Sequence, residues 1–318
     1  MTNRLTNGAG KAKAETPSVS GFSRYKVCDS YSVPITDSQT DGSLGQPLRL
    51  SKKKLEELDL SLSQRDKEVL LSVRRHRYLM SGQVQRLHFT DAANPSAALR
   101  AASRSLKKLK ELGLVDSLSR RIGGVRAGSA SLIWHTTHAG ERLLRLHEHR
   151  PYPIRRTFEP SPYFLAHTLA VAEASIHILE ISREAGLELS ALQPEPECWR
   201  VYSEHGKHVA LKPDLYAALT SAEYEDRYFL EIDLDTESPA KIIEKCQRYH
   251  KYYHSGLEQK EYGMFPLAVW IVPTRKRKEH LADHIHAAFV GQPRLFAVIT
   301  DDELDRLIRY GGDDAMLC

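Results

Sequence analysis

The sequence is poor in cysteine: its 318 residues include only Cys28, Cys198, Cys246 and Cys318. No two of them form a C-x-x-C pair, which argues against a disulfide framework and against a zinc site built from cysteine. No uninterrupted apolar run approaches about 20 residues, and the N-terminus lacks the continuous apolar core of a signal peptide. We therefore expect a protein of the reducing cytoplasm that has no membrane partner.

A large excess of one charge is also missing, because the formal net charge is only +4. Composition alone therefore does not indicate a nucleic-acid-binding protein. The charges are unevenly distributed, however. Residues 100–126 hold eight Lys/Arg against two acids, whereas residues 213–237 hold eight Asp/Glu against one arginine. This pattern is typical of a protein that holds a polyanion in one module and a cation in another.

The chain is long enough for two or three domains. Residues 1–58, rich in Ser, Thr, Gly and Asn where the chain begins, are expected to form a disordered or extended tail. Residues 59–149 have the periodicity of a compact, mainly helical unit. Residues 150–162 hold four prolines and are typical of a linker. Residues 163–310 alternate helical and strand patterns, and residues 311–318 are a second tail.

The unit at 59–149 is predicted to contain three helices, a hairpin and a fourth helix. Ser63 is a favourable cap for the first helix, Ser81 leads the second, and Pro95 begins the third. Residues 114–121 and 132–137 have strand patterns on either side of a glycine-rich turn. This order of helices and a basic-tipped hairpin resembles the winged helix-turn-helix family.

The third helix is predicted to be amphipathic. At about 100° per residue, its apolar residues lie nearly opposite a basic stripe; the apolar positions are Leu99, Ala102, Leu106 and Leu109. The resemblance implies a helix in the DNA major groove and basic side chains on phosphates. The implied DNA-binding residues are Arg100, Arg104, Lys107, Lys108, Arg120, Arg121 and Arg126. The alternatives are a merely solvated helix face and a module that binds protein.

The unit at 163–310 is predicted to be an α/β sandwich. A long helix over 163–186 comes first, and further helices begin at Pro239 and near Arg277. The predicted strands cover residues 187–193, 198–204, 207–219, 226–237, 264–274 and 294–300. The fold class is thus mixed, α+β followed by α/β.

Within the strand predicted at 226–237, apolar residues alternate with the acids Glu231, Asp233 and Asp235. Alternate side chains of a strand point to opposite faces, so we expect three carboxylates in a row on one face. Like charges this close repel unless a cation lies between them. A passive wet face would usually mix in Lys, Thr or Ser. The pattern favours a metal site over a solvated face.

Asp214, in the strand predicted at 207–219, supplies a second acidic position. Adjacent strands would bring Asp214 and Glu231 within reach of one cation. Magnesium typically takes one or two protein carboxylates together with phosphate oxygens, and it can generate hydroxide from water. The expected cofactor is therefore Mg²⁺ or Mn²⁺, with Asp214, Glu231 and Asp233 as candidate ligands.

Pro213-Asp214 is followed, seventeen residues after Asp214, by Glu231-Ile232-Asp233. In this order of helices and strands, the pattern resembles the PD-(D/E)xK nuclease superfamily. That superfamily would place a lysine where this chain has Asp233. Lys245 in the following helix is the best substitute, and Lys241 and Lys212 come next.

Several short motifs extend the resemblance over roughly residues 60–290. The winged helix pattern, the proline linker and the segments "FLAH", "KPD", "LEIDLDTES" and "KCQRYHKYY" together resemble the actinobacterial replication-relaxation family of plasmid proteins. The resemblance implies a role in replication, relaxation or transfer of plasmid or mobile-element DNA. The implied partners are double-stranded plasmid DNA, a second copy of the chain, and other replication or transfer proteins.

The resemblance implies a set of catalytic residues: Asp214, Glu231, Asp233, Lys245, His167 and Tyr249. Lys245 and Tyr249 are at i and i+4, so they share one helix face. Tyr249, Tyr252 or Tyr253 would be a nucleophile if relaxation proceeded through a covalent tyrosine; the alternative is that they pack in the core.

Two hypotheses about function stay open. The retained carboxylates favour a metal-dependent DNA-cleaving enzyme. The missing motif lysine favours a non-enzymatic replication accessory factor or transcriptional regulator, whose nuclease-like domain serves dimerisation or partner binding.

Overall fold

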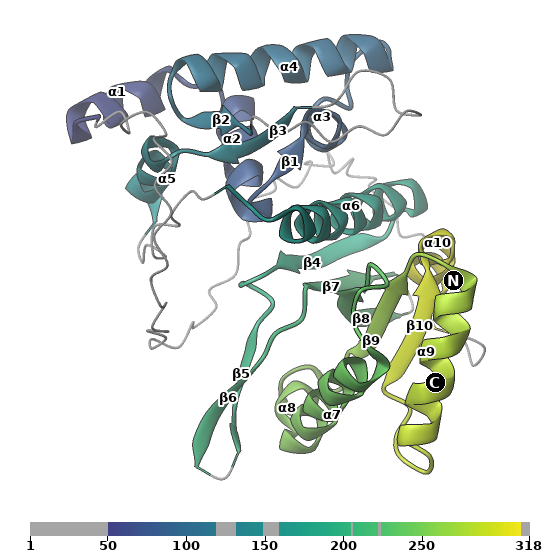
Figure 1. The fold of residues 1–318 in the computed structure, drawn as a ribbon. Helices are drawn as coiled ribbons and strands as arrows, with labels where there is room; N and C mark the ends of the chain where they lie inside the picture. The colour runs from purple at the N-terminus through teal and green to yellow at the C-terminus, as the bar shows by residue number, and fades with distance from the viewer. Residues whose placement is uncertain (1–49, 119–131, 149–158, 205, 222–223, 313–318) are drawn as a thin grey trace, which may run out of the picture. The chain divides into compact units, whose positions relative to one another are not determined.

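The computed structural model describes residues 50–118, 132–148, 159–204, 206–221 and 224–312, which form a mixed helix and sheet fold (Figure 1). Most of the predicted N-terminal tail, most of the proline-rich linker, and the turn of the predicted hairpin lie outside these residues.

The first part of the described chain is mainly helical. Its elements are α1 (Lys52–Ser61), α2 (Gln64–His76), β1 (Leu79–Met80), α3 (Ser81–His88), α4 (Pro95–Glu111), β2 (Val115–Ser117), β3 (Ile133–Thr136), α5 (His138–Leu144) and η1 (Arg145–His147). Among the described strands, β1, β3 and β2 form an antiparallel sheet in that order. Helix α1 lies mostly inside the predicted tail. It is held by buried Leu55 and Leu58, so the folded unit begins earlier than residue 59.

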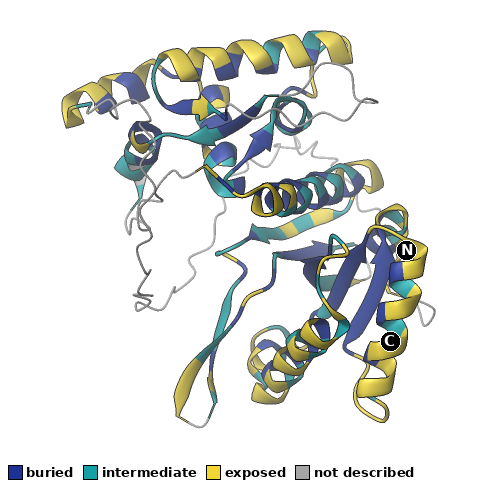
Figure 2. Cartoon of the chain, in the orientation of Figure 1, coloured by how far each residue is buried: buried dark blue, intermediate teal, exposed yellow. Residues whose placement is uncertain are grey.

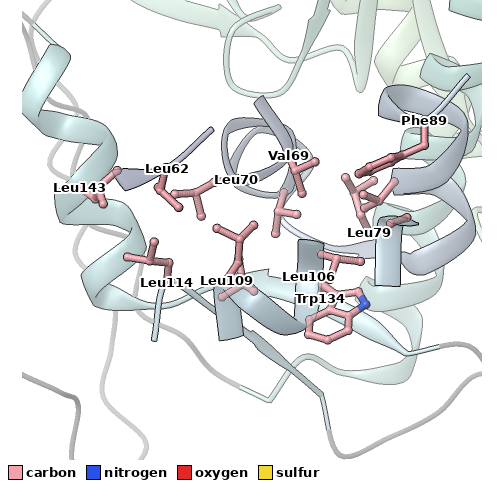
Figure 3. Close-up of a cluster of buried hydrophobic side chains, with 14 of the residues drawn as sticks. Leu62, Val69, Leu70, Leu79, Phe89, Leu106, Leu109, Leu114, Trp134 and Leu143 are labelled. Atoms are coloured by element: carbon pink, nitrogen blue, oxygen red, sulfur yellow. The ribbon is translucent and has the colours of Figure 1, made fainter. Parts of the chain in front are cut away.

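Local sequence explains where the helices of this unit begin. Ser63 accepts a hydrogen bond from the N–H of Asp66 at the start of α2, and Asn94 caps α4 ahead of Pro95. The helices enclose an apolar core, shown in Figure 3, whose labelled members are Leu62, Val69, Leu70, Leu79, Phe89, Leu106, Leu109, Leu114, Trp134 and Leu143.

The predicted apolar stripe of α4 was wrong at one position. Leu99 is 43% exposed, whereas Ala98 is buried with Ala102, Leu106 and Leu109. Because each helical residue advances about 100°, Leu99 lies at the edge of the buried face.

The second part of the chain alternates helices and strands. Its elements are α6 (Pro162–Ala185), β4 (Glu188–Pro194), β5 (Arg200–Glu204), β6 (Lys207–Leu211), β7 (Leu215–Thr220), β8 (Glu225–Ile232), α7 (Pro239–Ser255), α8 (Leu257–Tyr262), β9 (Leu267–Val272), α9 (Arg275–Ala288), β10 (Phe296–Thr300), η2 (Asp301–Glu303) and α10 (Leu304–Tyr310). Among the described strands, one sheet has the order β10-β9-β8-β7-β4. Its β8, β9 and β10 are parallel, and β7 is antiparallel to both neighbours.

Two strand predictions need correction. The strand predicted at 207–219 is two strands: β6 pairs with β5 in a separate hairpin, and β7 joins the main sheet. Pro213 lies at the break, as expected of a residue that cannot donate to a sheet. The strand predicted at 226–237 ends at Ile232, and Asp235 has a left-handed φ of 60°. The predicted row of three carboxylates on one strand face was therefore wrong.

Helices cover both faces of the main sheet. Leu215 and Leu230 pack with residues of α6 and α10, whereas Tyr216 and Phe229 pack with residues of α7 and α9. The alternation follows the two-residue period of the strands. Strands β9 and β10 are buried along most of their length, as expected of parallel strands covered on both sides (Figure 2).

Helix α6 belongs to both cores. Ala172 and Ile176 pack into the core of the first unit, whereas Ala174 and Ile178 pack on the sheet. Within the described residues, α6 is the helix long and apolar enough to cross a membrane by length and composition, and half of its most apolar stretch is buried here. A helix that is buried on two sides needs apolar residues around nearly its whole circumference.

Gly140 provides a test of the packing of α5. A Cβ at this position would lie 2.0 Å from the carbonyl oxygen of Leu114, which is main chain and cannot rotate away. We expect Gly140→Ala to lower the free energy of unfolding by about 3 kcal/mol or more, measured by urea denaturation.

Gly82→Ala is the matched control, because a Cβ there meets nothing within 4 Å. It should be neutral or stabilising by up to about 1 kcal/mol, since alanine is the better helix former. Equal stability of the two variants would contradict the close approach of α5 to Leu114.

Candidate functional site

Asp214 and Glu231 lie opposite each other where β7 and β8 meet. The register of the two strands pairs Leu215 with Leu230, so Asp214 and Glu231 are the next pair of facing positions. The Asp214 Oδ2 atom accepts a hydrogen bond of 2.8 Å from the N–H of Ile232. The structure therefore brings together the two acids that the sequence predicted on neighbouring strands.

Glu231 is a buried carboxyl group, 2% exposed. Its Oε1 accepts a 2.7 Å hydrogen bond from the Tyr249 hydroxyl, and its Oε2 lies 3.3 Å from Lys245 Nζ. Burial, and next the charge of Asp214, raise the pKa of Glu231 to about 8. Lys245 and Tyr249 act in the opposite direction but do not overcome this. A cation near both acids would relieve their repulsion.

Lys245 places a positive charge beside the two acids Asp214 and Glu231. Its Nζ also lies 3.2 Å from Glu237 Oε2. Burial lowers the pKa of Lys245, but the charges of Glu231, Asp214 and Glu237 outweigh burial, and the net shift is upward. The ammonium group thus stays protonated among three carboxyl groups. This is the lysine that the sequence suggested as a substitute for the motif lysine.

His167 reaches the site from α6. Its Nε2 lies 3.2 Å from Asp214 Oδ2 and 3.1 Å from the carbonyl oxygen of Ile232. Both neighbours are acceptors, so Nε2 carries a proton and donates it. Burial lowers the pKa of His167, but the hydrogen bond and charge of Asp214 outweigh burial and raise it. His167 therefore holds the Asp214 carboxylate in place.

Asp233 is directed to a different partner. Its Oδ2 accepts a 2.6 Å hydrogen bond from Arg277 Nε, and its Oδ1 accepts one from the N–H of Asp235. Arg277 also donates to the carbonyl oxygen of Glu237 and is only 8% exposed. Both oxygens of Asp233 are thus engaged in holding the turn after β8.

Arg277 was missed by sequence reasoning. It lies in a basic run, residues 274–280, which is typical of a phosphate contact or of a solvated helix start. The sequence contains one signal for its role: Arg277 lies in the first turn of α9, just after the cap Thr274. A side chain at this position points back toward the sheet. No sequence feature near Arg277 indicates that its partner is Asp233, which is 44 residues away.

Two of the three candidate tyrosines, Tyr249 and Tyr252, have hydroxyls engaged in hydrogen bonds. Tyr249 is 1% exposed, and burial, followed by the charge of Glu231, raises its pKa well above the usual value. Tyr252 donates a 2.8 Å hydrogen bond to Glu258 and is also buried. This geometry matches the interpretation of Tyr249 and Tyr252 as core residues.

The outer face of α4 carries the described part of the predicted DNA-binding set. Arg100, Arg104 and Lys107 are exposed there. Lys108 differs, because its Nζ lies 2.7 Å from Asp66 Oδ2 and holds α4 against α2. The wing candidates Arg120, Arg121 and Arg126 lie outside the described residues.

The donor set at Asp214 and Glu231 suits a hard divalent cation. In the described part of the chain, no group of three or more His, Cys, Asp or Glu residues could hold a metal ion. Two facing carboxyl groups nevertheless fit Mg²⁺ or Mn²⁺, because such ions complete their coordination with water and substrate phosphate oxygens. Burial, and next the charge of Asp214, raise the pKa of Glu231, as expected of a buried acid beside a second acid.

Comparison with known protein families covers both units and the site. The family model described as replication-relaxation matches residues 70–268, from α2 to β9. This is more than half of the chain, and the protein belongs to the replication-relaxation family. Membership indicates a role in plasmid or mobile-element replication, with DNA or replication-associated partners. No curated protein and no solved structure matches the chain.

The Asp233–Arg277 ion pair can be tested by stability. Asp233→Asn removes the charge that compensates a buried guanidinium, although Asp235 still lies 3.2 Å from Arg277 Nε. We expect the free energy of unfolding to fall by about 3 kcal/mol in urea denaturation, the lower end for a broken buried pair.

The control is Glu244→Gln, which breaks the exposed ion pair of Glu244 with Arg248. It should cost roughly 0.5 kcal/mol or less. An Asp233→Asn protein as stable as this control would show that the Asp233–Arg277 pair does not hold the turn.

Proposed function

We propose that this protein binds double-stranded plasmid or mobile-element DNA through its first unit and cleaves one strand at the Asp214–Glu231 site with Mg²⁺ or Mn²⁺. The observation that carries the proposal is that Asp214 and Glu231 lie at adjacent ends of β7 and β8, with Lys245 of α7 beside Glu231. Two carboxyl groups and a lysine are the groups by which metal-dependent nucleases hold a cation and a phosphate. Together with family membership, they support DNA processing.

The first unit supports the DNA-binding part of the proposal, because we interpret its fold as a winged helix. The order α2, β1, α3, α4, β2, β3 and the antiparallel sheet β1-β3-β2 follow the arrangement expected for that fold. In this interpretation α4 is the recognition helix, and its exposed residues Arg100, Arg104 and Lys107 face the DNA. The contacts with phosphates would set position and register rather than sequence preference.

The second unit supports the cleavage part of the proposal, because we interpret it as a PD-(D/E)xK nuclease-like domain. Asp214 and Glu231 would hold the cation, and His167 would keep the Asp214 carboxylate oriented by donating to Oδ2. When bound, the metal would polarise a phosphodiester and lower the pKa of a water ligand. Lys245 would place its positive charge where negative charge gathers on the phosphate during attack.

A second candidate function is a non-enzymatic replication accessory factor. Two observations favour it. Both oxygens of Glu231 already have partners, Tyr249 and Lys245. The lysine position of the motif is Asp233, which is paired with Arg277. In this alternative, the site is a folded remnant, and the second unit serves dimerisation or partner binding.

DNA binding by α4 predicts a specific salt response. Arg104→Ala with Lys107→Ala should weaken binding of duplex DNA. It should also reduce the slope of log K against log salt by about 1.8, since each phosphate contact contributes about 0.9. Fluorescence anisotropy over a salt series measures both effects.

The matched control is Lys52→Ala with Lys53→Ala, which removes the same charge from the exposed surface of α1. The control should keep the wild-type slope. A slope lowered equally in both double variants would indicate general charge attraction instead of a recognition helix.

Strand cleavage predicts metal-dependent nicking of supercoiled plasmid. The wild-type protein with Mg²⁺ or Mn²⁺ should convert supercoiled plasmid to the open-circular form, and chelation by EDTA should stop it. Asp214→Asn and Glu231→Gln keep the shape of each side chain but remove its charge. They should reduce the nicking rate by roughly a hundredfold or more, because metal binding is lost.

Glu244→Gln is the control for these variants, because it removes an exposed carboxylate from the same helix as Lys245. It should nick as fast as wild type. Equal nicking by every variant would point to a contaminating nuclease. If the wild-type protein binds DNA but does not nick it, the cleavage function is excluded and the accessory-factor function is supported.

A further inference from the structure

Two histidines on α7 direct the same ring nitrogen at each other. His250 and His254 are one helical turn apart, and their Nε2 atoms are 3.3 Å apart with ring centroids at 4.5 Å. Residues at i and i+4 share a helix face, which explains why the rings meet. At least one Nε2 must carry a proton in the metal-free protein, because two lone pairs at this distance repel.

A third donor comes from the turn after α9. The Gln292 Oε1 atom lies 3.2 Å from His250 Nε2. The turn is held by a hydrogen bond from the N–H of Gln292 to the carbonyl oxygen of Phe289, whose ring lies 5.8 Å from that of His250. Gly291 has a φ of 75°, a conformation that favours glycine. Two nitrogens of α7 and one oxygen of the turn after α9 therefore meet around His250 Nε2.

The distance between the two Nε2 atoms matches the distance between two ligand atoms of a tetrahedral metal ion. Zinc binds imidazole nitrogen at about 2.0–2.1 Å, so two such ligands at a tetrahedral angle are about 3.3 Å apart. His254 and Gln292 are exposed, which gives a cation access from solvent. Imidazole ligands suit Zn²⁺, Ni²⁺ and Cu²⁺, whereas Mg²⁺ requires oxygen ligands. The cation class is thus different from that expected at Asp214 and Glu231.

We propose that His250, His254 and Gln292 form a binding site for a divalent transition-metal ion of the zinc class. The ion replaces the proton shared by the two Nε2 atoms and takes water in its remaining positions. It joins α7 to the turn after α9. This proposal does not depend on DNA cleavage at the Asp214–Glu231 site.

Zinc titration of the full chain, carrying no histidine tag, tests the proposal. A chromogenic zinc indicator competing with the protein should report one tight equivalent of Zn²⁺ per chain. His254→Ala should weaken that equivalent by roughly tenfold or more, since one of two nitrogen ligands is lost. Gln292→Ala should weaken it less, and circular dichroism should show that both variants remain folded.

The chain contains a control pair with the same spacing. His280 and His284 on α9 have ring centroids 4.4 Å apart, but the Nδ1 of His284 lies 2.7 Å from the carbonyl oxygen of His280. His280→Ala with His284→Ala should leave the tight equivalent intact, and so should Glu231→Gln. The proposal is overturned if wild type binds no tight zinc, if His254→Ala binds it unchanged, or if either control loses it.

Discussion

The structure depends on the burial of α6 on two sides. Its residues complete the core of the helical unit on one side and cover the main sheet on the other. Arg86 of α3 reinforces the first contact through ion pairs with Glu173 and Glu180 of α6. His167, near the start of the same helix, donates to Asp214. Because interiors are close-packed, a shift of α6 in one core would be felt in the other and at this hydrogen bond.

Charge compensation organises the acidic end of β8. Buried acids are costly unless they are paired, protonated or bound to a cation. Asp233 is compensated by Arg277, whereas Glu231 has Lys245 on one oxygen and the Tyr249 hydroxyl on the other. The pKa of Glu231 is raised all the same, because burial and Asp214 outweigh these partners. Compensation is therefore incomplete at Glu231, whose neutral form is favoured over its ionised form relative to an exposed glutamate.

Sequence reasoning found the features that are encoded locally. The cap Ser63 and the first-turn residue Pro239 marked the starts of α2 and α7, and the meeting of Asp214 with Glu231 followed from strand adjacency. It missed the break at Pro213, where one long strand was predicted. It could not identify Arg277 as the partner of Asp233, because that pair depends on how α9 packs against the sheet. Local patterns predict single elements, whereas tertiary packing decides which charges meet.

The position of Asp233 now has a physical account. Because β8 ends at Ile232, Asp233 belongs to the turn that follows the strand. Here Asp233 is balanced by Arg277 at the start of α9, and the ammonium group beside Glu231 comes from Lys245 on α7. Each of these two acids is thus compensated by a basic residue from a helix that packs beside the end of β8. In the proposed cleavage function, Lys245 takes the role of the motif lysine, so Asp233 counts against that function only if Lys245 does not stay beside Glu231.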